Sequence, residues 1–174
     1  MLEHGSDVAG WQWPGRHLSP GLRFALRFFA CLLLCSVLFW ALSLHLHLGP
    51  VQRAMAAASA AVGRLVGGHA VAQGEDIVIA TLTLNVNHEC TGIFVCMLFA
   101  SFVLAYPASW RARAIGLLVG IPLFFVVNVV RLATLARIVE VYPQAFFYLH
   151  EYVWQGILTV FVLVGAIGWA ERLE

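Results

Sequence analysis

The sequence predicts an all-α integral membrane protein with about four transmembrane helices and a small extracytoplasmic insertion made of a helix and a β-hairpin. Hydrophobic residues make up 61% of the 174 residues and charged residues only 11%. Soluble domains have about half apolar and about a quarter charged residues. The second observation is a set of four apolar runs, each close to the roughly 20 residues that a membrane-spanning helix needs. The length suits one compact domain.

The N-terminal residues predict a cytoplasmic tail followed by the first span. Residues 1–21 are polar and rich in Gly and Pro, with Trp11 and Trp13 as interfacial aromatics. Residues 22–48 form the first apolar run and are expected to be the first transmembrane helix. This run is too long for the apolar region of a cleavable signal peptide, and no clear small-residue cleavage site follows it.

The segment 49–89 is not apolar throughout and predicts an extracytoplasmic helix and hairpin. Residues 51–66 are rich in Ala and predict a surface or interfacial helix, which ends at Gly67-Gly68. The segment 69–86 carries β-branched residues around a turn at 73–76, and its stretches 77–79 and 81–84 are typical of short strands.

Residues 90–171 predict a three-helix transmembrane core that carries the functional site. Its apolar runs are 92–109, 114–139 and 152–170, and the first of them is short and closed by Tyr106-Pro107. Arginines are expected to be more frequent on the cytoplasmic side of a membrane. With both termini cytoplasmic, six arginines lie inside: Arg16, Arg23, Arg27, Arg111, Arg113 and Arg172. The reverse orientation would translocate the N-terminal cluster and the Arg111/Arg113 turn.

This topology brings three chemically distinct side chains to one membrane face. Cys90 lies where the second span begins, and His150 lies where the fourth begins. Arg131 lies about 26 Å from the inner end of the third span at 1.5 Å per residue. The topology was assigned from the arginines of the inner loops, so it did not presuppose this convergence at the extracytoplasmic face.

Each of these side chains has a role in covalent catalysis on a peptide bond. The thiolate of Cys90 is the candidate nucleophile, and a neighbouring His or Arg favours the anion. His150 is the candidate acid/base because an imidazole titrates near neutral pH. Arg131 is the candidate stabiliser of the oxyanion. Asn128, three residues earlier on the same helix face, is expected to support Arg131.

Each residue taken alone also has a simpler interpretation. A Cys in an apolar chain usually fills space, Arg131 could extend to the lipid headgroups, and His150 could cap an interfacial helix. The polar sequence His88-Glu89-Cys90-Thr91-Gly92 and the joint placement of the three residues favour catalysis. The remaining histidines, including His45 and His47, are too scattered for a metal site, so we expect no metal and no cofactor.

Two other functions remain open. In a non-enzymatic assembly factor or transporter subunit, Arg131 would pair with Glu140 or Glu151, and Cys90 would be dispensable. In a membrane thiol oxidoreductase, Cys90 and Cys96 would act together, and Cys96→Ser would abolish function. The net charge of +1 gives no electrostatic case for nucleic acid, so none is expected as a partner.

The motifs Cys90-Thr91-Gly92 and Asn128-Val129-Val130-Arg131, followed by His150, resemble those of the exosortase/archaeosortase family. The resemblance covers about residues 70–170. The chain looks like a short form, similar to the exosortase H subgroup, because it lacks N-terminal spans that commoner members have. Substrate docking by those spans is therefore in doubt.

The resemblance implies a cysteine transpeptidase or endopeptidase of the bacterial cytoplasmic (inner) membrane. Its substrates would be exported proteins that end in a short motif, a transmembrane helix and a basic tail. Cys90 would be the nucleophile, Arg131 would support the transition state, and His150 would be the acid/base. The new C-terminus would pass to an acceptor such as a lipid or a glycan, with membrane lipids as the surroundings.

Overall fold

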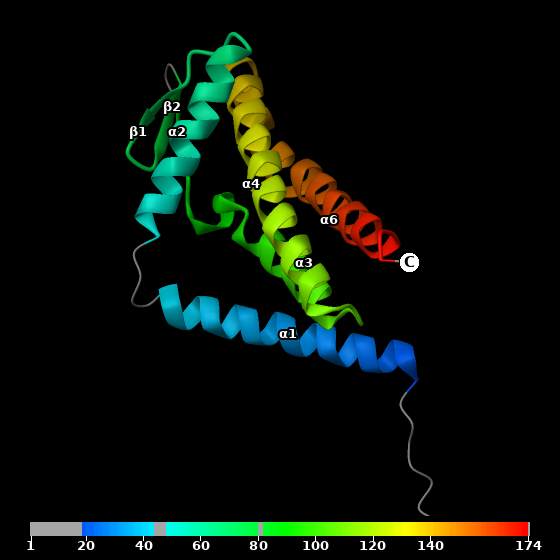
Figure 1. The fold of residues 1–174 in the computed structure, drawn as a ribbon. Coiled ribbons are helices and arrows are strands. Elements are labelled where there is room, and N and C mark those ends of the chain that lie inside the picture. The colour runs from blue at the N-terminus through cyan, green and yellow to red at the C-terminus, as the bar shows by residue number, and fades with distance from the viewer. Residues whose placement is uncertain (1–18, 44–47, 80–81, 174) are drawn as a thin grey trace, which may run out of the picture.

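The computed structural model describes residues 19–43, 48–79 and 82–173 as helices packed around a small sheet (Figure 1). The longer helices are α1 Pro20–Ser43, α2 Gly49–Leu65, α3 Ile93–Ala105, α4 Trp110–Val141 and α6 Trp154–Glu171. The short helical elements are η1 His88–Thr91, η2 Pro143–Ala145, α5 Phe146–Tyr148 and η3 Leu149–Val153. The strands are β1 Val71–Gln73, β2 Asp76–Ile79 and β3 Leu82–Asn85.

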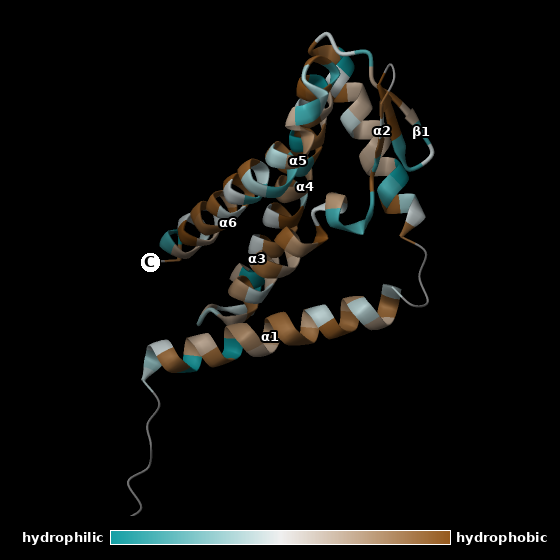
Figure 2. Cartoon of the chain, turned by 180° about the vertical axis from the view of Figure 1, so that it is seen from behind, coloured by the Kyte–Doolittle hydropathy of each residue, from teal (hydrophilic) through white to brown (hydrophobic). Residues whose placement is uncertain are grey.

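Helix α1 lies alongside α3 and is otherwise open to the surroundings (Figure 1). None of its 24 residues, all of them within the described part of the chain, is buried. Aromatic contacts determine which face of α1 packs against α3. The Phe24 ring contacts the rings of Phe102 and Tyr106 edge-on, with centroid distances of 5.5 and 6.3 Å. Figure 2 shows that apolar residues cover most of α1, as expected of a helix surrounded by lipid.

Three helical stretches are long and apolar enough to cross a membrane: Pro20–Ser43, Trp110–Val141 and Pro143–Glu171. The predicted span at 92–109 corresponds to α3, which has only 13 residues and is therefore about 20 Å long. The hydrocarbon core of a bilayer is about 30 Å thick. The mainly helical fold with three candidate membrane-spanning helices is thus confirmed, whereas the count of four spans stays a prediction.

Helix α4 is longer than the predicted span 114–139 at both ends. It begins after Ser109, whose Oγ accepts a hydrogen bond from the backbone N–H of Ala112 at 3.3 Å, as a helix N-cap does. Its 32 residues correspond to about 48 Å, which exceeds the thickness of the hydrocarbon core. The C-terminal part of α4 is therefore free to pack against the insertion instead of lipid.

The insertion contains the predicted helix and a three-stranded antiparallel sheet in the order β1-β2-β3, one strand more than the predicted hairpin. The pairs Val71↔Val78 and Ile79↔Leu82 fix its register. Strand β1 escaped sequence analysis because it has only three residues, too few to show an alternating pattern. Gly74 supplies the positive φ, 63°, of the β1–β2 turn.

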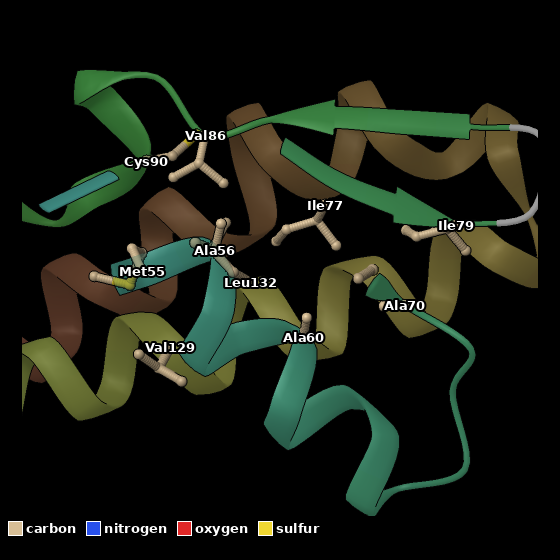
Figure 3. Packing of buried hydrophobic residues seen from close by; sticks show 11 residues of the cluster. Met55, Ala56, Ala60, Ala70, Ile77, Ile79, Val86, Cys90, Val129 and Leu132 are labelled. Carbon is tan, nitrogen blue, oxygen red and sulfur yellow. The ribbon is translucent and has the colours of Figure 1, made fainter. Parts of the chain in front are cut away.

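The small side chains of α2 let it pack closely between the sheet and α4 (Figure 3). Ala56 and Ala60 are buried on α2, Ile77 is buried on β2, and Leu132 is buried on α4. Cys90 lies at the edge of the same cluster, beside Val86 (Figure 3). This apolar core therefore fixes the position of η1 relative to the C-terminal half of α4.

A second core joins α3, α4 and α6. It contains Phe99, Val103, Phe124, Val162 and Ala166. The rings of Phe99 and Phe124 lie 4.9 Å apart, and a Cβ added at Gly120 would overlap the Phe99 ring. The absence of a side chain at Gly120 is thus what allows α3 to approach α4.

The start of the last span differs from its predicted beginning at residue 152. A helical path already begins at Phe146 and passes through the π-helical turn η3 before α6. The aromatic and charged residues Tyr148, His150 and Glu151 hid this helix from a search for apolar runs.

Candidate active site

The turn η1 positions the Cys90 thiol at the beginning of α3. Asn87 caps η1, and its Oδ1 accepts a hydrogen bond from the backbone N–H of Cys90 at 3.1 Å. Asn before such a turn is a typical cap. Gly92 ends η1 and precedes α3 with φ 76°, a left-handed conformation that favours glycine. The chain direction therefore changes sharply just after Cys90.

The imidazole of His150 faces this thiol. The Nε2 of His150 lies 3.6 Å from the Sγ of Cys90, although 60 residues separate them in the chain. The other ring nitrogen, Nδ1, lies 3.2 Å from the Oε1 of Glu151. The Phe146 ring stacks on the imidazole at 5.3 Å with an interplanar angle of 22°. Both edges and one face of the imidazole are thus in contact with protein groups.

The guanidinium of Arg131 is connected to Cys90 through Asn128. Arg131 Nη1 donates to Asn128 Oδ1 at 3.3 Å, and Asn128 Nδ2 donates to the backbone carbonyl of Cys90 at 2.6 Å. Arg131 and Asn128 are almost fully buried, with 2% and 1% exposure. The structure thus brings together the four side chains singled out from the sequence, from three separate elements.

The buried positive charge of Arg131 has no carboxylate partner within the described part of the chain. Glu140 pairs with Arg137 at 3.1 Å and with His69 at 2.8 Å instead, while Glu151 contacts His150. Glu140 lies nine residues beyond Arg131, too far along the helix to reach it. Arg131 Nε also has no hydrogen-bond partner among the described residues. A buried unpaired charge is costly, so this site is suited to an anion that would compensate it.

Burial raises the pKa of the Cys90 thiol above its usual value. The positive charge of Arg131 and the hydrogen bond from Asn87 lower this pKa, and the negative charges of Glu89 and Glu151 raise it, but burial has the largest effect. Arg131 thus favours the thiolate, as expected from the sequence, but the effect of burial on the pKa of Cys90 is larger. A thiol at this position needs a base to accept its proton, and His150 Nε2 is in place to do so.

This raised pKa predicts the pH dependence of Cys90 alkylation. With Cys31, Cys35 and Cys96 replaced by Ser, we expect the iodoacetamide reaction of Cys90 to keep accelerating above about pH 9, where ordinary thiols level off. The reason is that only the thiolate reacts. Mass spectrometry of the full chain in nanodiscs measures the rate. The same chain unfolded in detergent should show an ordinary profile, and an early plateau in the folded protein would contradict the expectation.

Of the other candidate groups that the structure describes, Cys96 packs against the second core, formed by α3, α4 and α6. The four cysteines are free, and Cys96 lies within α3. The described residues hold no group of three or more His, Cys, Asp or Glu side chains suited to a metal ion. His45 and His47 lie outside the described residues. The absence of a metal and of a cofactor stays a prediction.

Sequence analysis missed two neighbours of the site, Asn87 and Phe146, and it missed the contact between Glu151 and His150. Asn87 carried a signal, because Asn followed by a polar His-Glu-Cys segment is typical of a helix cap. The contact of Glu151 carried none. Adjacent residues on an ordinary α-helix do not face each other, and the π-helical turn at Leu149–Val153 is not readable from the residue pattern.

Apolar spanning helices that hold a thiol, an imidazole and a buried guanidinium together define a multi-pass membrane protein with a candidate cysteine-type site. The comparison with known proteins is consistent with this class. Residues 18–169 match the model of the transmembrane exosortase family (Exosortase_EpsH), and the chain belongs to that family.

A curated relative and the solved structures complete the comparison. The chain is 27% identical over 92 residues to a protein of Methanocaldococcus jannaschii described as a probable archaeosortase E. The match covers 53% of this chain and 50% of that protein, so the chain matches about half the length of this relative. No solved structure matches the chain.

Proposed function

We propose that this chain is a membrane-embedded cysteine transpeptidase or endopeptidase that cleaves a C-terminal sorting signal of exported proteins. The observation that carries the proposal is the 3.6 Å approach of Cys90 Sγ to His150 Nε2 beside a buried guanidinium that pairs with no carboxylate among the described residues. Membership of the exosortase family supports the same class of reaction. The substrates are exported proteins that end in a short motif, a transmembrane helix and a basic tail.

The reaction begins with a proton transfer. His150 Nε2 takes the proton of Cys90, and the thiolate attacks the carbonyl carbon of the scissile peptide bond. The negative charge moves to the carbonyl oxygen, which the Arg131 guanidinium stabilises. His150 then returns the proton to the departing amine, and a thioester on Cys90 remains. An acceptor nucleophile or a water molecule then gives its proton to His150, attacks this thioester and releases the Cys90 thiolate, which takes the proton back.

Asn128 has a positioning role in this scheme. It accepts from Arg131 and donates to the backbone of Cys90, so it fixes the guanidinium relative to the nucleophile. Because the site is buried, its charge interactions are stronger than they would be in water. The acceptor, such as a lipid or a glycan, reaches the thioester from the membrane surface.

The protein acts in the bacterial inner membrane, with its site at the extracytoplasmic face and both termini in the cytoplasm. Arg111 and Arg113 at the start of α4 and Arg172 at the end of α6 support this orientation. The length of α4 supports a site at the membrane rim, because Arg131 lies 21 residues beyond Trp110, about 32 Å along the helix.

The direct test is to trap the thioester. The chain is co-produced with an exported protein of the same genome that carries a motif, an apolar span and an Arg-rich end, and the complex is then acid-quenched. We expect a covalent adduct on Cys90 that hydroxylamine releases, and no adduct in Cys90→Ser. The matched variant Cys96→Ser should form the adduct normally. Cleavage that continues in Cys90→Ser, or that requires Cys96, would overturn the proposal.

A further inference from the structure

The π-helical turn η3 produces an unusual pair of neighbours. His150 and Glu151 are consecutive residues, and on an α-helix consecutive side chains diverge. In η3 the turn is wider, so consecutive side chains diverge less, and Nδ1 of His150 lies 3.2 Å from Oε1 of Glu151. π-Helical turns are rare and occur frequently at functional sites. This turn occurs at the residue whose Nε2 faces Cys90.

The two contacts of the His150 imidazole determine which of its ring nitrogens carries the proton. Glu151 is acceptor-only when ionised, so the contact with Nδ1 requires a proton on that nitrogen. With Nδ1 protonated, Nε2 of the neutral ring is the acceptor that faces Cys90. The stacked Phe146 ring further restricts rotation of the imidazole. Glu151 thus selects the one tautomer in which His150 can take the thiol proton.

We propose that Glu151 is the positioning residue of the site, which orients His150 and stabilises the imidazolium formed when Cys90 loses its proton. The proposal rests on the function proposed above, because it assigns Glu151 a role in the same proton transfer. Glu151 acts through His150 and not on the substrate. A carboxylate that holds the Nδ1–H of a catalytic histidine has this effect on other protein scaffolds.

A simpler role for Glu151 makes the opposite prediction. Its side chain is 53% exposed, so it could be a surface charge that acts on Cys90 directly through space. Burial is the main cause of the raised pKa of Cys90, and the charges of Glu89 and Glu151 raise it further, while Arg131 lowers it. If Glu151 acted only in this way, removing its charge would increase the thiolate fraction and accelerate alkylation.

Glu89 provides a matched control for this distinction. It lies next to Cys90 in the chain, and no hydrogen bond joins it to His150 in the described part of the chain. Replacing either glutamate by Gln removes one negative charge near the thiol. The two variants therefore share the direct electrostatic effect and differ only in the contact with the imidazole.

The experiment measures iodoacetamide alkylation of Cys90 near neutral pH. It uses the full chain in nanodiscs, with the other three cysteines replaced by Ser. We expect Glu89→Gln to react faster than the parent and Glu151→Gln to react about 3- to 10-fold more slowly, because the small thiolate–imidazolium fraction is lost. Glu151→Asp should recover part of the rate. Unchanged thermal unfolding and circular dichroism would exclude misfolding as the cause.

The outcomes separate this inference from the proposed function. If Glu151→Gln reacts as fast as or faster than the parent while His150→Gln reacts more slowly, Glu151 is only a surface charge and the inference fails alone. If His150→Gln also reacts like the parent, the thiol and imidazole do not exchange a proton, and the proposed function fails with it. The positioning role is supported if Glu151→Gln and His150→Gln both react more slowly than the parent while Glu89→Gln reacts faster.

Discussion

Replacing Arg131 by Gln is expected to lower the rate of substrate cleavage by about 10²- to 10³-fold, the usual effect of removing one oxyanion donor. Gln keeps a polar side chain, although a shorter one, and has no charge to stabilise the oxyanion. The cleavage rate is measured on the co-produced substrate, by monitoring the loss of its C-terminal segment over time. Formation of the thioester should slow in parallel, because the guanidinium acts on the step that forms it.

The same substitution is expected to leave the stability of the protein unchanged or to raise it. Arg131 is 2% exposed and pairs with no carboxylate among the described residues, so its charge does not stabilise the fold. A loss of activity without a loss of thermal stability distinguishes a functional buried charge from a structural one. If Arg131 were a structural ion-pair residue, as in a non-enzymatic subunit, Arg131→Gln would unfold the protein.

Arg137→Gln is the matched control on the same helix. Arg137 is partly exposed and pairs with Glu140 at 3.1 Å, and an exposed pair of this kind contributes at most about 1 kcal/mol. We expect cleavage to continue at nearly the original rate. Equal losses of cleavage in the two variants would show that α4 tolerates no loss of charge and would contradict a specific role for Arg131.

Sequence analysis singled out side chains that the structure brings together, although they lie far apart in the chain. Cys90, Arg131 and His150 were singled out because polar residues at the mouths of apolar spans are unusual, and this signal does not depend on exact helix ends. Helix α4 begins before the apolar run 114–139 because Arg111 and Arg113 are charged and interrupt the apolar pattern, although the chain continues as a helix through them. Hydropathy identifies the part of a helix that is suited to lipid. The helix itself can extend beyond that part at both ends, as α4 does.

The contacts around the three side chains were harder to predict. The link from Arg131 through Asn128 follows partly from spacing, since residues three apart share a helix face, but its end at the Cys90 carbonyl depends on how α4 packs against η1. The net direction of the Cys90 pKa was beyond the sequence for a similar reason. The sequence indicates which charges are near, whereas the dominant effect is burial, which depends on the packing of α2, η1 and α4.

Gly92→Ala is expected to disturb this arrangement without touching any of the reacting groups. Gly92 has φ 76°, and an added Cβ would lie 3.0 Å from Cγ and 3.2 Å from Nδ2 of Asn128. The left-handed conformation alone costs an L-residue roughly 1–2 kcal/mol. The displaced Asn128 would also lose its short hydrogen bond to Cys90 and shift Arg131. Such small misplacements lower catalytic rates by roughly 10- to 100-fold.

Gly74→Ala separates backbone strain from this displacement. Gly74 has a similar φ of 63°, but nothing lies within 4 Å of an added Cβ, and the residue belongs to the β1–β2 turn. Both variants should lose comparable thermal stability from the conformational strain, measured on the full chain in nanodiscs. Only Gly92→Ala should also lose cleavage activity beyond what its remaining folded fraction explains. If the two variants cleave substrate equally well, Asn128 does not position Arg131 against Cys90, because the contact can be displaced without consequence.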